Sequence, residues 1–561
     1  MRQDDKPWYV ADFETTGINY YKEHGCTKVW LYAVADSQGK IANWGSSIDG
    51  FFDWCREHGN SVIYFHNLRF DGSFILSWLL SHGYPLEDRV KMAGKKSFQT
   101  LIDEDGQFYM IKANLGRRIQ ITFQDSLKII PLKVKEIAKA FKLPIEKEKI
   151  AYDDYTIDED RLRYVYHDVQ IVAMALRYFR DNGFSKMTIG SNAYNAYKST
   201  IRNFEHYFPM LDREWLKEWR KAYRGGRSQV NPLYEGKTLA GVRRYDINSM
   251  YPYAMSRFPM PIGKPILQDR IGMRRFELFV IDVSFKLKQG HLPTLLKKCS
   301  MFSNTDTYYT ETEGVERIWI SNIDFELLQR HYDIAYLKIG TIYGFATVRD
   351  IFRDWIDDYY AKKSESQGGM KLLYKLVINN LYGKFGSKCE GGNKVPYLDE
   401  RGRLAFTKTD ISDMRCYYLP VAIAITSYCH KLIDDAILKT GYDRFVYCDT
   451  DSVHTLGTLP DDWVDSKEIG KFKLEGIEDK AKYVRQKCYV HRENGKYTIT
   501  CAGMSEGVKE WLLEKYGDGI FEEFKVGLTV LPEDIPQDKA KLRPVQVKGG
   551  VILMPVGFAL R

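Results

Sequence analysis

The sequence has few of the features that mark secreted or membrane-spanning proteins. Its nine cysteines are scattered through 561 residues without a CxxC pair, which argues against a disulfide framework and a thiolate zinc site. The charged first seven residues precede no apolar run, so we expect no signal peptide. The longest strongly apolar stretch, near residues 419–425, is too short to cross a bilayer. These absences predict a soluble, intracellular protein.

A strong charge imbalance is also missing. The 82 basic and 74 acidic residues give a net charge of +8, which permits a nucleic-acid partner without requiring one. The apolar content of 44% is ordinary for a soluble globular protein. The chain is too long for one hydrophobic core, so we expect two or more domains.

Hydrophobic patterning predicts an α/β first domain followed by a mixed α+β remainder. Buried strands at residues 8–14, 62–65 and 119–123 and a helix at 161–179 indicate a first domain that ends near Gly190. The Tyr223–Gly226 segment is a loop signal that opens the second region. Further predictions are a strand at 242–245, a strand-rich stretch at 261–351, a helical hairpin from 349–363 and 370–381, and β-hairpins at 395–406 and 543–554.

Asp12 and Glu14 lie two residues apart, and therefore on one face of the first predicted strand. Alone, this pattern is more typical of a solvated edge strand. The apolar surroundings weaken that interpretation, because like charges beside a buried strand need a counter-charge, and Mg²⁺ would provide one. We expect Asp71 at a strand end after residues 62–65, and Tyr164 and Asp168 on one face of the predicted helix. The alternative for these three residues is that they are ordinary surface residues without a functional role.

Together these five residues resemble the exonuclease motifs of proofreading family B DNA polymerases. The resemblance implies that the four acids bind two metal ions and that Tyr164 orients the attacking water. It makes Lys147 a catalytic-site helper. It further implies contacts to the single-stranded primer end from Thr15, Asn67, Phe70, Ser126, Leu127 and Tyr152.

A second acidic set lies in the other half of the chain. Asp449-Thr450-Asp451 separates two predicted strands, and such a turn alone is ordinary turn chemistry. Asp246, at the end of the strand predicted at 242–245, adds a third carboxylate. Three carboxylates at strand ends can hold two Mg²⁺ ions about 3.5–4 Å apart for in-line phosphoryl transfer.

One stripe of the predicted helix at 370–381 continues this chemistry. Neighbouring lysines four residues apart repel each other, which favours a polyphosphate partner, although a solvated basic face is an equal alternative for the lysines alone. The stripe consists of Lys371, Lys375, Asn379 and Tyr382.

These segments resemble the polymerase motifs of family B in order and spacing. Residues 246–252, 375–383 and 447–452 are similar to motifs A, B and C, Tyr223–Gly226 to the YxGG loop, and Lys487-Cys488-Tyr489 to the KxY motif. Asn380 is a departure, because the family usually has Ser there. The likeness spans nearly the whole chain and is strongest to the protein-primed polymerases of small tailed bacteriophages, the phi-29-like group.

The resemblance assigns roles to these residues. Asp246 and Asp451 would be the principal metal ligands with Asp449 assisting, and Lys375, supported by Lys371, would neutralise the triphosphate. Tyr251 would lie under the incoming sugar and exclude a 2′-hydroxyl. The other implied contacts are to nucleotide, from Asn379 and Tyr382, and to DNA, from Tyr223, Gly225, Gly226, Lys487 and Tyr489.

The implied architecture is a right-hand polymerase of palm, fingers and thumb behind an RNase H-like 3′→5′ exonuclease domain. Its implied parts are exonuclease 1–190, palm 191–260 and 420–515, fingers 351–386, thumb 516–561, and two insertions at 261–350 and 387–419. The first insertion would contact a priming terminal protein. The second would encircle the DNA and give processivity and strand displacement.

The resemblance also implies cofactors and partners. Each site would use two Mg²⁺ ions, with Mn²⁺ tolerated. The partners would be template-primer DNA, dNTPs and the terminal protein, for a monomeric enzyme that replicates a linear viral genome in the host-cell cytoplasm, without a membrane.

Two other functions compete with this interpretation. A nuclease with a degenerate second half is one, against which the intact Asp246, Asp449, Asp451 and Lys375 speak. The other is a non-catalytic DNA-binding scaffold, which would not need two complete acidic sets.

Overall fold

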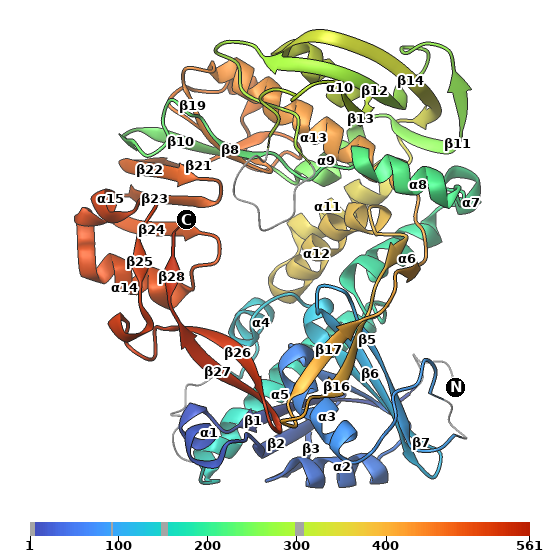
Figure 1. The fold of residues 1–561 in the computed structure, drawn as a ribbon, viewed down its shortest axis with the longest axis vertical. Helices are drawn as coiled ribbons and strands as arrows, with labels where there is room; N and C mark the ends of the chain where they lie inside the picture. Colours follow the sequence, from blue (N-terminus) through green and yellow to red (C-terminus); the bar gives the residue numbers. More distant parts are fainter. Residues whose placement is uncertain (1–5, 91–93, 147–154, 298–307, 561) are drawn as a thin grey trace.

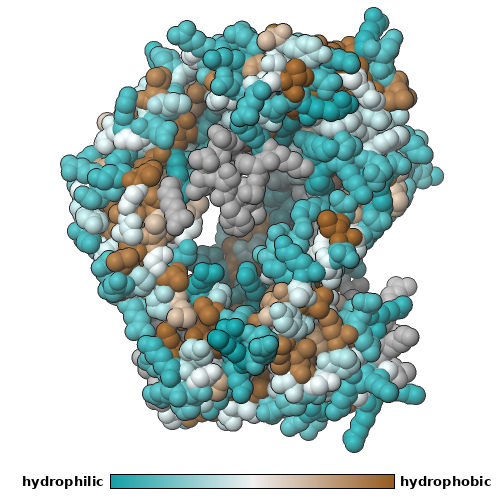
Figure 2. All heavy atoms as spheres, viewed as in Figure 1, coloured by the Kyte–Doolittle hydropathy of each residue, from teal (hydrophilic) through white to brown (hydrophobic). Residues whose placement is uncertain are grey.

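The computed structural model describes residues 6–90, 94–146, 155–297 and 308–560. Its elements are arranged as a frame, with the N-terminal domain at the bottom of Figure 1 and the strands of the first insertion at the top. Figure 2 shows that this face of the molecule is hollowed at its centre and that most of its side chains are hydrophilic. No described helix is long and apolar enough to cross a membrane.

A seven-stranded mixed sheet forms the core of the N-terminal domain. Its elements are β1 (Trp8–Thr15), α1 (Ile18–His24), β2 (Val29–Asp36), β3 (Ile41–Gly45), α2 (Ile48–Glu57), β4 (Val62–Phe65), α3 (Leu68–Ser81), β5 (Ser97–Ile102), β6 (Phe108–Gly116), β7 (Ile119–Asp125), α4 (Val134–Phe141) and α5 (Glu159–Asp181). The strand order is β3-β2-β1-β4-β7-β6-β5, with β4 parallel to β1 and β7. The predicted strands and helix are confirmed, the helix being two residues longer at each end.

Alternation along β1 decides which side chains face which helix. Ala11 and Phe13 pack in the cluster that holds the buried residues of α2 and α3, whereas Val10 packs with those of α5. Successive residues of a strand point to opposite faces. Asp12 and Glu14 therefore share the α5 side of the sheet.

A second, five-stranded antiparallel sheet carries the other acidic set. Its strands, in the order β21-β10-β20-β19-β8, are β21 (Phe472–Glu478), β10 (Val242–Ile247), β20 (Ser452–Thr455), β19 (Phe445–Asp449) and β8 (Ser228–Val230). Beside it lie α9 (Met250–Arg257) and the long helix α13 (Leu419–Thr440), whose first turns are the apolar stretch at 419–425. The strand predicted at 242–245 extends to Ile247, so Asp246 lies within the strand and not beyond it.

The first insertion is strand-rich, as predicted. It forms a four-stranded sheet in the order β11-β14-β12-β13, from β11 (Met260–Gln268), β14 (Tyr332–Val348), β12 (Phe276–Leu287) and β13 (Glu316–Ser321). Helix α10 (Asn322–His331) joins β13 to β14 and packs against α13. The insertion is therefore attached directly to the helix beside the second sheet.

The predicted helical hairpin is confirmed as α11 (Arg353–Glu365) and α12 (Gly368–Phe385), which pack against each other. On α12 the buried residues Leu373, Val377 and Leu381 face inward. Three connecting helices lie in the chain between α5 and the second sheet: α6 (Ile189–Thr200), α7 (Phe204–Tyr207) and α8 (Arg213–Trp219). The stripe from Lys371 to Tyr382 lies away from the buried face of α12.

Both predicted β-hairpins are present. The first pairs β16 (Lys394–Leu398) with β17 (Leu404–Lys408), turning where the Gly402 amide donates to the Asp399 carbonyl. The second pairs β26 (Lys541–Val547) with β27 (Gly550–Val556). Figure 1 shows the two hairpins converging on the N-terminal domain.

Lys548, in the turn of the second hairpin, is the point where these parts meet. Its backbone bridges to Arg403 of the first hairpin and to Cys26 of the N-terminal domain, and its carbonyl accepts from the Thr27 amide at 2.9 Å. The frame is closed at this residue.

The remaining C-terminal elements form a small sheet and a helical cap. They are β9 (Thr238–Leu239), β22 (Lys480–Arg485), β23 (Cys488–Glu493), β24 (Lys496–Cys501), α14 (Glu506–Tyr516), α15 (Ile520–Glu523), β25 (Thr529–Val530) and β28 (Phe558–Ala559). The short strands β15 (Glu390–Gly391) and β18 (Ser412–Asp413), which flank the first hairpin in the chain, pair with each other.

Candidate catalytic sites

The structure places the first acidic set on three neighbouring elements. Asp12 and Glu14 are on β1, Tyr164 and Asp168 are buried on α5, and α5 packs on β1. Asp71 follows β4, as predicted, but the prediction that it lies at the strand end is wrong, because Asp71 is in the first turn of α3. Asn67, in a left-handed conformation with φ 79°, begins this helix directly after β4.

Asp71 lies close enough to the acids of β1 to interact with them electrostatically. Burial raises the pKa of the Asp71 carboxyl well above its usual range, and the charges of Asp12 and Glu14 raise it further. One of its buried carboxylate oxygens has no hydrogen-bond partner among the described residues. A buried oxygen of this kind beside two further carboxylates suits a divalent cation.

The residues predicted to hold the primer end lie around this set. Asn67 is exposed, whereas Phe70 on α3 and Thr15 at the end of β1 are half-buried. The buried Ser126 hydroxyl donates to the Phe65 carbonyl at 3.0 Å, and the Leu127 amide donates to Asp125 at 2.9 Å. Lys147 and Tyr152 lie outside the described residues.

The second acidic set is assembled from β10, the end of β19 and the turn that follows β19. Asp246 on β10 pairs in register with Ser452 on β20, and the Ile247 amide donates to the Asp451 carbonyl at 2.8 Å. Asp449 ends β19. Burial, then Asp451 and Glu475, raises the pKa of Asp246 to about 7. The carboxylates therefore repel one another, a repulsion that a cation between them would relieve.

The turn between Asp449 and Asp451 depends on the Tyr223–Gly226 loop. Thr450 has a left-handed backbone, with φ 61°, and its amide donates to the Arg227 carbonyl at 2.7 Å. A Cβ on Gly226 would lie 2.9 Å from the Thr450 side chain, so only glycine fits there. Tyr223 packs equally closely against Gly386, next to the end of α12. The loop thus touches both the acidic turn and α12.

Lys487 lies over Asp449. Its ammonium donates to both carboxylate oxygens, at 2.6 and 2.8 Å, and its backbone amide donates to the Tyr447 hydroxyl at 3.1 Å. Tyr489 stacks on Tyr483, with ring centroids 5.0 Å apart. The KxY segment is therefore next to the acidic turn, and Lys487 supplies a positive charge there.

Lys375 of the helical hairpin faces the acids, and two further lysines lie near it, one of which the sequence did not reveal. Lys371 and Lys375 are exposed on α12. Burial raises the pKa values of Asp246 and Asp451, and the charge of Lys375 offsets part of that rise. Lys363 in the last turn of α11 donates to the Ser249 hydroxyl at 3.2 Å. Burial, then Lys375 and Lys371, lowers the pKa of Lys363 to about 8. The sequence signal that could have identified Lys363 was its position at the junction of the predicted helical hairpin.

Two tyrosines lie between the lysines and the acids. The rings of Tyr251 on α9 and Tyr382 on α12 are stacked, and both residues are half-buried. Asn379 is half-buried on the same stripe. Asn380, the departure from the family pattern, donates its side-chain amide to the Leu376 carbonyl at 2.7 Å, so its side chain is used within its own helix.

Among the described residues, no three His, Cys, Asp or Glu side chains are arranged to hold a metal ion. The side chains nevertheless fit divalent cations chemically, since both sets consist of carboxylates, and burial together with neighbouring acids raises the pKa of Asp71 in the first set and of Asp246 in the second. The candidate ligands are Asp12, Glu14, Asp71 and Asp168 in the first set, and Asp246, Asp449 and Asp451 in the second.

Comparison with known proteins identifies the chain. A family model described as DNA polymerase type B, organellar and viral, matches residues 53–156 and 152–468. The chain is 34% identical to the DNA polymerase of Bacillus phage phi29 over 100% of both chains. It is 31% identical to the DNA polymerase of Streptococcus phage Cp-1, over 99% of this chain and 98% of the relative.

Solved structures agree with this similarity. Phi29 DNA polymerase aligns with a TM-score of 0.89 at 33% identity, covering 99% of this chain and 100% of that chain. Its complex with primer-template DNA and incoming nucleotide substrates aligns with a TM-score of 0.88, at the same identity and coverage. The predicted fold class, a right-hand polymerase behind an N-terminal exonuclease-type α/β domain, is confirmed. The chain therefore belongs to the type B DNA polymerases of viruses and organelles, among the phi29-like phage enzymes, and is a DNA-directed DNA polymerase.

Proposed function

We propose that this polymerase copies a DNA template from a protein primer and removes misincorporated nucleotides with a separate 3′→5′ exonuclease site, each site using two Mg²⁺ ions. The observation that carries the polymerase site is the meeting of Asp246, Asp449 and Asp451 with lysines from the helical hairpin. A cluster of acids opposite a cluster of lysines suits metal-bound triphosphate. Mn²⁺ is expected to substitute for Mg²⁺.

The residues divide the work of nucleotide addition. Asp246 and Asp451, with Asp449 assisting, would hold the cations, which would lower the pKa of the primer hydroxyl and stabilise the charge that develops on the phosphate. Lys375, Lys371 and Lys363 neutralise the triphosphate as pyrophosphate leaves. Lys487, which lies on Asp449, holds the primer backbone beside the acids, and Tyr489 supports it.

The exonuclease proposal rests on the second, separate acidic set. Asp71 carries a raised pKa next to Asp12 and Glu14, and Tyr164 lies one helical turn before Asp168. In this proposal the four acids bind the cations, and Tyr164 orients the water that attacks the last phosphodiester. Thr15, Asn67, Phe70, Ser126 and Leu127 then hold the frayed primer end.

In this proposal the first insertion provides the contact for protein priming, and the second provides processivity. The exposed middle of β14 presents Tyr336, Leu337 and Ile339 to solvent, a surface suited to a protein partner, and we assign it to the terminal protein. The β16–β17 hairpin closes the frame around DNA. The enzyme then acts as a monomer in the host-cell cytoplasm on a linear genome, with template-primer DNA and dNTPs as its other partners.

Asp451→Asn tests the assignment of the polymerase site. An amide cannot supply the negative charge that two cations need, so nucleotide incorporation should stop while degradation of single-stranded DNA continues. Asp461→Asn, an exposed acid of the same region, is the matched control and should behave as the parent. Residual synthesis within about tenfold of the parent, roughly 1.4 kcal/mol of barrier, would show that Asp451 is not a main ligand.

The priming proposal has its own test. Genome replicated by this enzyme should carry protein attached covalently to its 5′ ends when it is isolated without protease. Free 5′ ends on all such molecules would rule out protein priming.

A further inference from the structure

An ion pair buried behind the acidic turn involves a residue that no motif includes. Arg227, immediately after Gly226, donates to the Asp434 carboxylate of α13 at 3.0 Å. The two side chains are 1% and 0% exposed. A buried charge is retained only when it is paired, and breaking such a pair is costly. The pair therefore fixes the position of the Arg227 backbone.

The Arg227 backbone is itself part of the polymerase site. Its carbonyl accepts from the Thr450 amide at 2.7 Å, between the two aspartates of the turn. Thr450 has a left-handed backbone and is the single residue between Asp449 and Asp451. The carbonyl of Arg227 thus holds the single residue that sets the separation of the two carboxylates.

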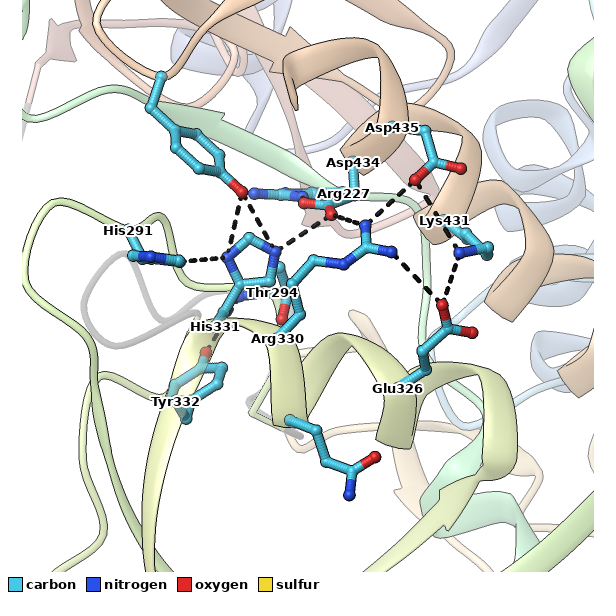
Figure 3. A network of polar contacts seen from close by, with 12 residues as sticks. Arg227, His291, Thr294, Glu326, Arg330, His331, Tyr332, Lys431, Asp434 and Asp435 are labelled. Atoms are coloured by element: carbon cyan, nitrogen blue, oxygen red, sulfur yellow. Dashed lines mark hydrogen bonds and ion pairs between the residues drawn. The ribbon is translucent and has the colours of Figure 1, made fainter. Parts of the chain in front are cut away.

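The first insertion completes the support from the other side (Figure 3). Arg330 and His331, at the end of α10, contact the second oxygen of Asp434 at 2.9 and 3.1 Å. Burial raises the pKa of Asp434, but the hydrogen bond from His331 and the charge of Arg227 hold it well below its usual range. Asp434 thus joins three basic side chains from two separate segments.

A second set of buried contacts also links the segment before Thr450's partner Arg227 to helix α10. His430, one turn before Asp434 on α13, contacts the Gly225 carbonyl through Nε2 at 2.6 Å and Asp324 of α10 through Nδ1 at 2.9 Å. Ser427 donates to the other oxygen of Asp324 at 2.7 Å. Gly225 and Arg227 are therefore both tied, through α13, to helix α10 of the insertion.

We propose that Asp434 and His430 are positioning residues for nucleotide incorporation, and that helix α10 of the first insertion completes their support. They hold the Gly225–Arg227 segment against Thr450, and this fixes the spacing of Asp449 and Asp451. The insertion then has a role in DNA-primed synthesis, separate from any contact with a priming protein. The inference rests on the proposed assignment of Asp449 and Asp451 as metal ligands.

Asp434→Asn is the main test, with Glu326→Gln as the matched control. Glu326 belongs to the exposed rim of the same network, where it pairs with Arg330 and Lys431 and does not contact Asp434. Asp434→Asn should lower kcat for primer extension by about tenfold or more and raise the Mg²⁺ concentration at half-maximal rate. Its KM for dNTP and its degradation of single-stranded DNA should stay near the parent values. Glu326→Gln should change none of these quantities.

Amide hydrogen exchange gives a readout without metal or substrate. The Thr450 amide, which donates to Arg227, should exchange faster in Asp434→Asn and at the parental rate in Glu326→Gln. Should Asp434→Asn fail to fold, Arg330→Gln removes one partly exposed cation of the network and is expected to show the same changes at smaller size. Loss of melting temperature alone, with unchanged kcat, Mg²⁺ dependence and Thr450 exchange, would overturn the proposal.

Variants of Arg227 separate positioning from stability. Arg227→Lys keeps the charge and should retain more activity than Arg227→Met. The double variant Arg227→Met with Asp434→Leu removes both charges of the buried pair, and Arg330 keeps Asp435 and Glu326 as partners. It should therefore recover stability but not kcat. Recovery of both would show that the ion pair acts only on folding. Asp451→Asn, measured in parallel, distinguishes a failure of this inference from a failure of the metal-ligand assignment.

Discussion

The rings of Tyr251 and Tyr382 stack with centroids 4.0 Å apart and planes 14° from parallel. Tyr251 comes from the helix that follows Asp246, and Tyr382 from the helix that carries Lys375. This contact joins the acids to the helical hairpin at the place where the sugar of an incoming nucleotide is proposed to lie. A ring held in this way leaves little room for an additional hydroxyl.

We expect Tyr251→Val to raise ribonucleotide use more than it lowers deoxynucleotide use. The shorter side chain removes a clash with the 2′-hydroxyl and adds no attraction. The ratio of kcat/KM for dNTP over rNTP measures the effect. Tyr253→Val, on the same helix but in contact with Phe258, is the control. An unchanged ratio in Tyr251→Val would place the sugar gate elsewhere.

Lys363→Met should raise the KM for dNTP, because one of the three cations that face the triphosphate is lost. The pKa of Lys363 is lowered to about 8, and a triphosphate binds the protonated form, so the parent KM should rise as the pH increases through about 8. This rise should be absent in Lys363→Met. Lys362→Met, whose lysine pairs with Asp358 instead, should keep both the parent KM and its pH dependence. Equal effects of the two variants would count against the assignment.

Asp12→Ala combined with Asp71→Ala should abolish 3′→5′ degradation and leave primer extension largely intact. Asp12 lies on the sheet of the N-terminal domain and Asp71 on its helix α3, whereas the polymerase acids belong to a different sheet. A loss of about a hundredfold or more is expected, since charge stabilisation by each metal amounts to several kcal/mol. Release of nucleotides from a labelled single strand measures it, with Asp53→Ala, at an exposed acid of α2, as control. An equal loss of both activities would contradict two separate sites.

Deleting residues 394–408 should shorten products and block synthesis at a downstream duplex. Two glycines in place of the deleted hairpin can close the gap as a tight turn, because Asn393 and Thr409 are already hydrogen-bonded to each other at 2.9 Å. Short additions to an open primed template should survive. Product length under a polymerase trap is the measurement, with Glu400→Gln in the hairpin turn as control. Full-length strand-displacement products from one binding event would refute this role.

Periodicity predicted the local parts of both sites. Asp12 and Glu14 share a face because a strand alternates, and Tyr164 and Asp168 share one because four residues make about one helical turn. The prediction for Asp71 was wrong because a single left-handed residue, Asn67, turns the chain into a helix. No hydrophobic pattern signals such a backbone conformation.

Contacts between distant segments could not be predicted from the sequence. Arg227, His331 and Asp434 come from three segments that are far apart in the chain and meet only when α10 packs on α13. Lys363 was missed for a related reason, since a lysine at a helix end usually faces solvent. The half-buried environment of Lys363 arises from the neighbouring helix α12 and from Ser249.

The meeting of two hairpins and the N-terminal domain at Lys548 has a topological consequence. A closed frame can be threaded by a free DNA end, but a DNA circle cannot enter until the frame opens. The two hairpins are joined by the backbone bridge between Lys548 and Arg403. Each of these residues is next to a glycine with a left-handed backbone, Gly549 beside Lys548 and Gly402 beside Arg403. Loading onto circular templates should therefore be limited by the rate at which this joint opens, whereas loading at ends should not.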